Sequence, residues 1–239
     1  MSIAQGRDFY QLKIYHVASP QQEAQLDDFL KDAYLPALHR AGIDKVGVFK
    51  PIPGADTALS VYLFIPYSSY DQFGTLDDVL AQDKTYQATG ETYLRAAYDH
   101  PPYERIETIL LHAFEKSPHF GVPELSTPKS ERVYELRSYE SPTEAYHRNK
   151  VAMFNDGDEI GLFKRLGFNA VFYGQVIAGS RMPNLMYLTS FENKQARDEH
   201  WDAFNNDAYW KTLSAKPEYQ HNVSRNQQTF LYPTEYSDI

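Results

Sequence analysis

An internal duplication is the feature that most constrains the fold of this chain. Residues 133–140 read VYELRSYE, and residues 9–16, near the start, read FYQLKIYH. The two segments align without a gap, so that a tyrosine, a leucine, a cation and a second tyrosine fall at matching positions. Because side chains alternate between the two faces of a strand, the cation and the second tyrosine share one face in both segments. The sequence therefore predicts a binding face that occurs twice.

The order of the predicted elements also occurs twice. Apolar periodicity predicts one helix after the first strand and another helix after the third strand of each half. The predicted strands span 9–17, 45–50, 59–65 and 105–114 in the first half, and 132–140, 169–177, 185–191 and 227–232 in the second half. This βαββαβ order is that of a ferredoxin-like unit, and its recurrence predicts an internal repeat.

The duplication divides the chain into two repeats and a linker. We predict a first ferredoxin-like repeat at 1–115, a linker at 116–131 and a second repeat at 132–239. A four-stranded sheet of this order carries both helices on one face and leaves the other face bare. In a duplicated chain the simplest cover for each bare face is the other half. We therefore predict an α+β fold whose two sheets pack face to face as an α/β barrel with the helices outside.

Five residues of the two matching strands form the best candidate site. Glu135, Arg137 and Tyr139 share one face of the second-half strand, and Lys13 and Tyr15 lie on the corresponding face of the first. The opposite face is apolar and suits the helices, so we expect the mixed face to point between the sheets. Charges in that space are poorly solvated and must be paired or used on a ligand.

These residue types suit an anionic ligand. Arginine can hold a carboxylate or enolate with a forked pair of donors, and a buried tyrosine can donate to a developing oxyanion. We therefore predict ligand binding by all five residues, with Glu135 and Arg137 as the candidates for catalysis. The alternative is structural, because Glu135 and Arg137 can pair with each other, or with Lys13, and simply hold the barrel closed.

Composition and motifs exclude several classes of function. The formal net charge of −9 opposes nucleic-acid binding, which depends on cationic contacts to phosphates. No apolar run approaches the roughly 20 residues that span a bilayer, and the absence of cysteine excludes disulfides and thiolate metal sites. The histidines form no H-E-x-x-H motif, and the sequence has no G-x-S-x-G, Walker or G-x-G-x-x-G motif. We therefore predict no metal and no cofactor.

The start of the chain leaves the compartment open. Residues 1–7 (MSIAQGR) are too short and too polar for a signal peptide. We expect a cytoplasmic protein if Met1 is native, and a periplasmic or secreted protein if 1–7 is the remnant of a trimmed signal peptide.

Four segments of the second half carry a resemblance to a known family. They are the motif Y-E-L-R-x-Y at 134–139, FKRLGFNAVFYG at 163–174, RMPNLMYLTSFEN at 181–193 and ARDEHWDAFNNDAYW at 196–210. In these segments the chain resembles the NIPSNAP family. The first half resembles it less, since Gln11 and Lys13 stand where the motif has glutamate and arginine.

The resemblance implies the dimeric α/β barrel superfamily, here with both barrel halves in one chain, and it implies no particular activity. We expect a protein that binds a small anionic or phenolic molecule between the two sheets. The first alternative is an enzyme, because related dimeric α/β barrels include cofactor-free monooxygenases, isomerases of small aromatics and haem-dependent enzymes. The second alternative is a protein-interaction module without a small ligand, which a filled barrel interior would favour. Homo-oligomers through exposed helices or sheet edges stay open.

Overall fold

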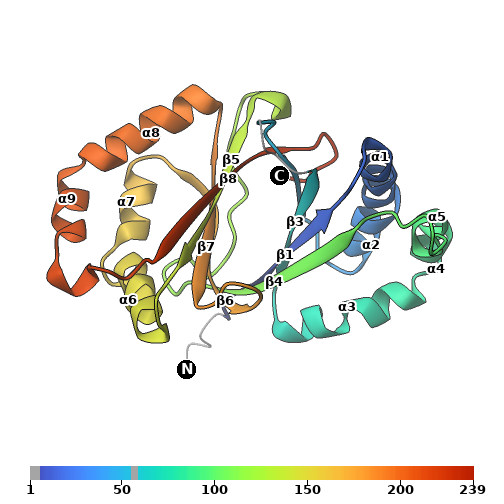
Figure 1. Ribbon diagram of the computed structural model, residues 1–239, viewed down its shortest axis with the longest axis horizontal. Coiled ribbons are helices and arrows are strands. Elements are labelled where there is room, and N and C mark those ends of the chain that lie inside the picture. The colour runs from blue at the N-terminus through green and yellow to red at the C-terminus, as the bar shows by residue number, and fades with distance from the viewer. Residues whose placement is uncertain (1–5, 55–58) are drawn as a thin grey trace.

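The chain folds into one closed barrel of eight strands with helices outside it (Figure 1). The computed structural model describes residues 6–54 and 59–239. The strands are β1 Phe9–His16, β2 Gly47–Pro51, β3 Ser60–Tyr67, β4 Arg105–Ala113, β5 Val133–Glu140, β6 Asn169–Ala178, β7 Asn184–Phe191 and β8 Arg225–Pro233.

The strand order confirms the predicted fold class. Around the barrel the order is β1-β3-β2-β8-β5-β7-β6-β4, and every neighbouring pair is antiparallel. Each half contributes four consecutive strands, and the halves join at two seams, where β2 pairs with β8 and β4 pairs with β6. The boundaries predicted for the two repeats and the linker stay a prediction, because the seams merge both sheets into one barrel.

Helices cover the outer face of each half, and the two helix layers lie on opposite sides of the barrel (Figure 1). The first half carries α1 Pro20–Phe29, the π-helix η1 Leu30–Tyr34, α2 Leu35–Arg40, α3 Tyr70–Gln82, α4 Lys84–Thr89 and α5 Glu91–Leu94. The short 3-10 helix η2 Lys129–Glu131 precedes β5, and the second half carries α6 Glu144–Asn155, α7 Glu159–Arg165, α8 Lys194–Asn206, α9 Ala208–Ser214 and the 3-10 helix η3 Pro217–Tyr219.

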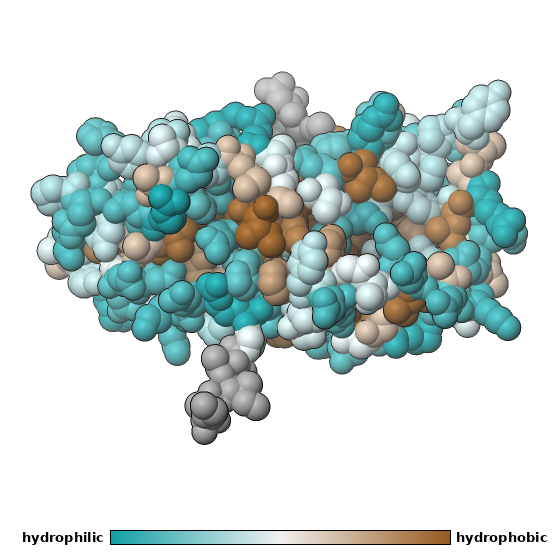
Figure 2. Space-filling view, turned by 90° about the horizontal axis from the view of Figure 1, so that it is seen from below, coloured by the Kyte–Doolittle hydropathy of each residue, from teal (hydrophilic) through white to brown (hydrophobic). Residues whose placement is uncertain are grey.

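The helical surface is mainly hydrophilic. Seen from below, polar and charged residues dominate, and apolar residues reach this face only in small groups (Figure 2). Among the described residues, no helix combines the length and the apolar character that crossing a membrane requires.

The barrel interior is filled at one end and hollow at the other. At the filled end the rings of Tyr10, Phe64 and Phe172 pack together, with centroids 5.0 to 5.3 Å apart. Phe120, from the connection between the halves, and Ile239 pack against this cluster and cover it. At the opposite end, where β1 and β5 finish, no such cover is present among the described residues, and a cavity opens.

Candidate functional site

The five residues singled out from the sequence point away from the barrel interior. They are Lys13, Tyr15, Glu135, Arg137 and Tyr139. The interior is instead filled by the apolar face of the same strands, which includes Leu12 and Leu136. The predicted orientation is therefore wrong. It assumed that a face of mixed polarity cannot pack against helices, but here the helices supply their own polar partners, such as Arg197 and Trp201 of α8.

Glu135 is the centre of a buried ionic cluster between β5 and α8. Its carboxylate is fully buried and accepts hydrogen bonds from Nε of Arg137 at 2.7 Å, Nε of Arg197 at 2.8 Å and Nε1 of Trp201 at 2.7 Å. Burial alone would raise the pKa of Glu135, but hydrogen bonds and charge from Arg197 and Arg137 outweigh it and lower that pKa. Glu135 is therefore held as a carboxylate, with its acceptors already occupied.

Arg137 is equally occupied. Its guanidinium carbon lies 3.7 Å from the ring centroid of Trp201, and its Nη1 donates to the hydroxyl of Tyr139 at 3.2 Å. Tyr139 in turn shares a hydrogen bond of 2.8 Å with the hydroxyl of Tyr187. The structure thus brings Glu135, Arg137 and Tyr139 together as partners of one another, which is the arrangement that the structural alternative describes.

Lys13 and Tyr15 lie apart from these three residues, beneath the helices of the first half. The Lys13 ammonium lies 5.3 Å from the ring centroid of Tyr15 and 5.1 Å from that of Tyr34 in η1. Because the helix layers lie on opposite sides of the barrel (Figure 1), Lys13 cannot pair with Glu135. The matching faces of β1 and β5 therefore lie in two separate environments, one beneath each helix layer.

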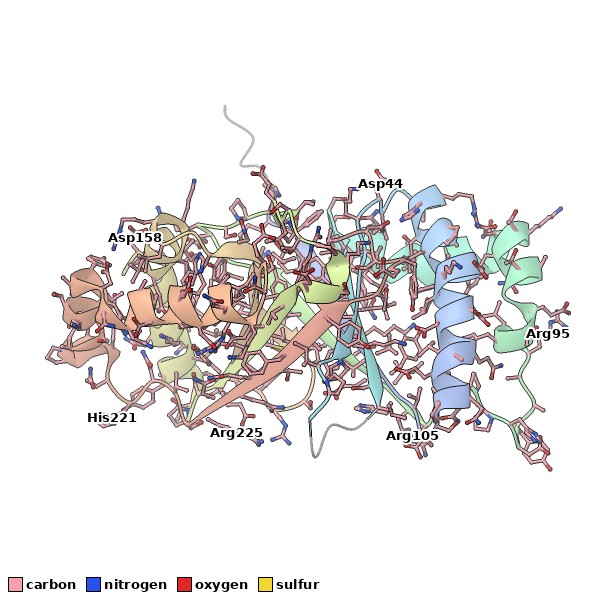
Figure 3. The ribbon with its side chains drawn as sticks, turned by 90° about the horizontal axis from the view of Figure 1, so that it is seen from above. Asp44, Arg95, Arg105, Asp158, His221 and Arg225 are labelled. Atoms are coloured by element: carbon pink, nitrogen blue, oxygen red, sulfur yellow. The ribbon has the colours of Figure 1, made fainter. Side chains whose placement is uncertain are left out.

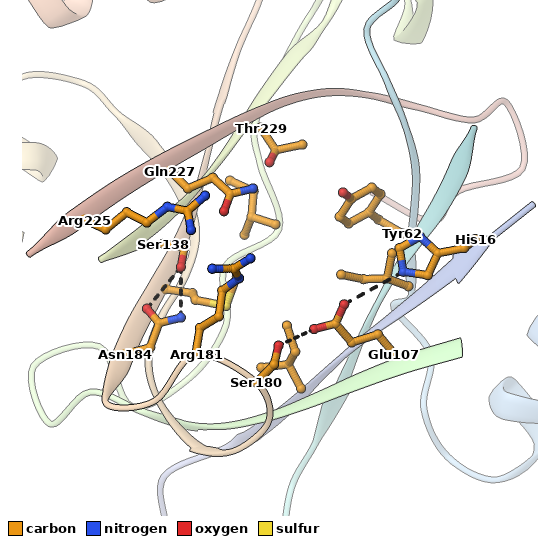
Figure 4. A pocket seen from close by; sticks show the side chains of 14 residues that line it. His16, Tyr62, Glu107, Ser138, Ser180, Arg181, Asn184, Arg225, Gln227 and Thr229 are labelled. Atoms are coloured by element: carbon orange, nitrogen blue, oxygen red, sulfur yellow. Dashed lines mark hydrogen bonds and ion pairs between the residues drawn. The ribbon is translucent and has the colours of Figure 1, made fainter. Parts of the chain in front are cut away.

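The open end of the barrel holds a cavity of about 280 Å³ that both halves line (Figure 4). Its apolar wall consists of Ile14, Ile109, Leu136 and Met186. Polar side chains surround this wall at the opening, which we call the mouth. This volume lies just below the range of about 300 to 1,000 Å³ that ligand pockets occupy, so the cavity suits only a small molecule.

Two arginines line one side of the mouth (Figure 4). The side chains of Arg181 and Arg225 are 53% and 51% exposed, and each lies near Glu140, with N–O distances of 3.6 and 3.9 Å. These distances exceed those of a hydrogen bond. In the described part of the chain, the buried Oε1 of Glu140 has no hydrogen-bond partner. The forked donors of both arginines therefore remain available to an anion.

His16 and Glu107 lie on the other side of the mouth (Figure 4). The His16 Nε2 lies 3.8 Å from a Glu107 carboxylate oxygen, and the Ser180 hydroxyl donates to Glu107 at 2.6 Å. Burial raises the pKa of the nearby Tyr62, although a hydrogen bond with Ser60 lowers it. The Tyr62 phenol is therefore a neutral group at the mouth, beside a histidine and a carboxylate.

The turn between β6 and β7 positions Ser180 and Arg181. Gly179 has φ +153° and Arg181 has φ +62°, so both residues have positive φ. For a residue with a Cβ this backbone conformation costs of the order of 1 to 3 kcal/mol, and such strain is concentrated at functional sites. The turn therefore holds the Arg181 side chain at the mouth at a measurable cost in stability.

The residues of the mouth do not stand out in the sequence, because they come from elements far apart in the chain. One signal was available. The interior face of β1 changes from apolar Ile14 to His16, and that of β5 changes from Leu136 to Ser138, at the same end of both strands. Such a change marks the end at which an interior opens to solvent. Arg105 and Arg225 lie at this end of the molecule, and Asp44 lies at the other (Figure 3).

Comparison with known families concerns the second half. The NIPSNAP family model matches residues 134–238. These residues form a NIPSNAP domain. The match confirms the resemblance seen in the motif around Arg137, and the NIPSNAP domain supplies both arginines of the mouth, whereas His16 and Glu107 come from the unmatched first half. No protein of curated function matches this chain by sequence.

Several solved structures resemble nearly the whole chain and not only the NIPSNAP domain. A putative monooxygenase from Lactobacillus acidophilus is 11% identical, with 95% of this chain and 94% of that chain covered and a TM-score of 0.61. A mutant chlorite dismutase from Candidatus Nitrospira defluvii is 9% identical, with 96% and 92% covered and a TM-score of 0.53. An anthrone oxidase-like protein is 11% identical, with 97% and 93% covered and a TM-score of 0.54. These likenesses establish the α/β barrel fold.

Three or more histidine, cysteine, aspartate or glutamate side chains do not gather as a metal site within residues 6–54 and 59–239.

Proposed function

We propose that this protein binds a small carboxylic acid or phenol, as its anion, in the mouth of the barrel. The observation that carries the proposal is the pair Arg181 and Arg225, whose guanidinium groups line the cavity at the open end of the barrel without a hydrogen-bonded counter-ion among the described residues. Guanidinium groups bind carboxylates with two parallel hydrogen bonds, and such charge-assisted bonds are about twice as strong as neutral ones.

The apolar wall selects the body of the ligand. Leu136, Met186 and Ile109 offer a surface for a small ring or a short aliphatic chain, while the arginines hold the anionic group at the opening. Burial of the ring on this wall adds roughly 25 cal/mol for each Å² removed from water. A porphyrin is much larger than this cavity, so the haem-dependent alternative finds no support at this site.

A second candidate function is an enzyme that moves a proton on the bound acid or phenol. His16 favours it, because imidazole exchanges protons near neutral pH and Glu107 lies 3.8 Å from its Nε2. A phenol deprotonated at this position could isomerise, or react with dioxygen as co-substrate, and some proteins of similar fold are named as a putative monooxygenase or an anthrone oxidase-like protein. The interaction module is less favoured, since the barrel interior holds a cavity.

The binding proposal is tested by titration with benzoate, salicylate and 4-hydroxybenzoate, with benzamide as the neutral control. We expect the acids to bind and benzamide to bind at least tenfold more weakly. Arg181→Gln and Arg225→Gln should each weaken acid binding by roughly ten- to a hundredfold, as the loss of hydrogen bonds to a charged group implies. Arg95→Gln, at the 78% exposed C-cap of α5, is the matched control and should have no effect. Equal binding by the wild type and the double arginine variant would refute the proposal.

A further inference from the structure

Lys13 is a partly buried cation with no carboxylate partner. Its side chain projects from β1 into the layer between the barrel and the first-half helices, where the rings of Tyr15 and Tyr34 face its ammonium. Among residues 6–54 and 59–239, no aspartate or glutamate oxygen lies within 4.0 Å of this nitrogen. Within the described residues, Lys13 is thus held by the rings of Tyr15 and Tyr34, which contact its ammonium without accepting a proton from it.

The second half shows what is missing around Lys13. The matching position there is Arg137, and its Nε lies 2.7 Å from Glu135, two residues earlier on the same strand face. The first half has Gln11 at that earlier position, and this amide accepts a hydrogen bond from Tyr67 instead. The duplication has therefore kept the cation in both halves and the counter-ion in only one.

The surroundings of Lys13 make its ammonium easier to deprotonate than that of an exposed lysine. Burial lowers the pKa of Lys13, and the charge of Asp77 on α3 opposes this effect only in part. Burial also raises the pKa of both Tyr15 and Tyr34, so the phenols of these neighbours stay neutral and cannot replace the missing carboxylate. A lysine desolvated in an apolar pocket is an activated nucleophile, because only its unprotonated form has a free electron pair.

A π turn places one of the two rings. The helical segment from α1 to α2 widens at η1, where the N–H of Leu35 bonds the carbonyl of Leu30, five residues earlier. Pro36 follows directly and lacks the N–H that would continue the normal pattern. Tyr34 is the last residue of this turn, and its ring lies near the Lys13 ammonium. π turns inside helices occur frequently at functional sites.

We propose that Lys13 is a reactive amine that forms an imine with a small aromatic or apolar aldehyde or ketone between β1 and η1. The unprotonated Nζ attacks the carbonyl carbon, a C–N bond forms, and the carbonyl oxygen leaves as water, with no change of oxidation state. The rings of Tyr15 and Tyr34 stabilise the protonated imine as they stabilise the ammonium. This site is separate from the mouth and does not depend on the function proposed there.

Reductive trapping tests the proposal on the full-length protein. Benzaldehyde and cyanoborohydride are added at pH 7, and mass spectrometry of the digested protein gives the initial rate of alkylation at each lysine. We expect Lys13 to react at least tenfold faster than Lys31, which is exposed on η1 and serves as the internal reference. A rate at Lys13 equal to or below that at Lys31 would overturn the proposal.

Two substitutions separate reactivity from accessibility. Gln11→Glu supplies the carboxylate that the second half has, and should slow alkylation of Lys13 at least tenfold by holding its proton. Asp77→Asn removes a charge that favours the ammonium and should accelerate the reaction. Unchanged rates in both variants would show that access alone controls labelling, which contradicts the proposal. Arg181→Gln should leave the rate at Lys13 unchanged. The proposal for Lys13 and the proposal for the mouth can therefore fail independently of each other.

Discussion

Arg137 lies over the indole of Trp201, with its guanidinium carbon 3.7 Å from the ring centroid, while both side chains donate to the carboxylate of Glu135. This contact joins β5 to α8 through one buried anion. A change of charge at Glu135 would therefore disturb the packing of the strand and of the helix together.

Glu135→Gln should therefore strongly destabilise the protein. The substitution leaves Arg137 and Arg197 with a neutral partner, and breaking a buried ion pair costs about 3 to 5 kcal/mol. Urea unfolding measures the loss. Asp198→Asn is the control, because Asp198 also pairs with Arg197 but is 50% exposed, and it should cost less than about 1 kcal/mol. Similar losses in the two variants would show that the cluster does not support the fold.

Glu159 should give the stability of the protein a distinct pH dependence. Burial raises its pKa, although Lys150 at 3.0 Å lowers it, whereas an unfolded glutamate titrates near pH 4.3. Between these two pKa values the native state binds more protons than the unfolded state. The contribution of Glu159 to stability is therefore present at low pH and falls as pH rises through this interval.

Glu159→Gln should remove that component. We expect urea unfolding of the wild type and the variant, measured from about pH 4 to pH 8, to give curves that converge toward acid pH and separate as pH rises. The contribution of Glu135 to stability depends on pH in the opposite direction. Its lowered pKa means that its contribution is present above the unfolded pKa and is lost as pH falls through its folded value. Parallel curves for the wild type and Glu159→Gln would show that Glu159 does not cause this pH dependence.

Two glycines, Gly42 and Gly74, allow the effect of backbone conformation on stability to be compared. Gly42 ends the first helical segment with φ +82°, and Gly74 lies within α3, and neither has an atom within 4 Å of an added Cβ. Gly42→Ala should destabilise the protein by about 1 to 2 kcal/mol, because a Cβ disfavours the left-handed conformation. Gly74→Ala should stabilise it by about 0.5 to 1 kcal/mol through helix propensity. Thermal unfolding of both variants checks the opposite signs.

Glu140 should act as a competitor of an anionic ligand at the mouth. It lies 3.6 Å from Arg181 and 3.9 Å from Arg225 without a hydrogen bond to either. Glu140→Gln should strengthen benzoate binding severalfold, since the bound carboxylate then shares the arginines with no other negative charge. Titration at low and high salt measures the effect. Weaker binding by Glu140→Gln would mean that Glu140 instead positions the two arginines for the ligand.

The fold was predictable because it depends on patterns that a sequence states directly. Apolar and polar residues alternate in the strands, and apolar residues form stripes along the helices. Because these patterns recur in the same order, they predict two ferredoxin-like halves. The closed barrel followed from the need to cover two bare faces. Gly42 follows the C-cap of α2 with φ +82°, the left-handed conformation that glycine adopts readily at a helix end.

The site was less predictable, because its residues meet only in three dimensions. Arg137 and Glu135 attracted attention as charges on a strand, but Arg197 and Trp201, which pair with Glu135, come from a helix about sixty residues later. A single sequence does not state which face of a strand meets that helix. The same limit applies to the mouth, where Arg181 depends on a turn conformation that its residue type disfavours.

Carrying both halves in one chain allows the mouth to be asymmetric. β1 and β5 both end at this opening, on opposite sides of the barrel, and by the alignment of the two strands His16 occupies the place that Glu140 occupies in the other half. An assembly of two identical chains would present every rim residue twice, so that like charges would face each other. Here one lip is basic, with Arg181 and Arg225, and the opposite lip carries a histidine and an acid. A molecule bound at the mouth would therefore take one defined orientation.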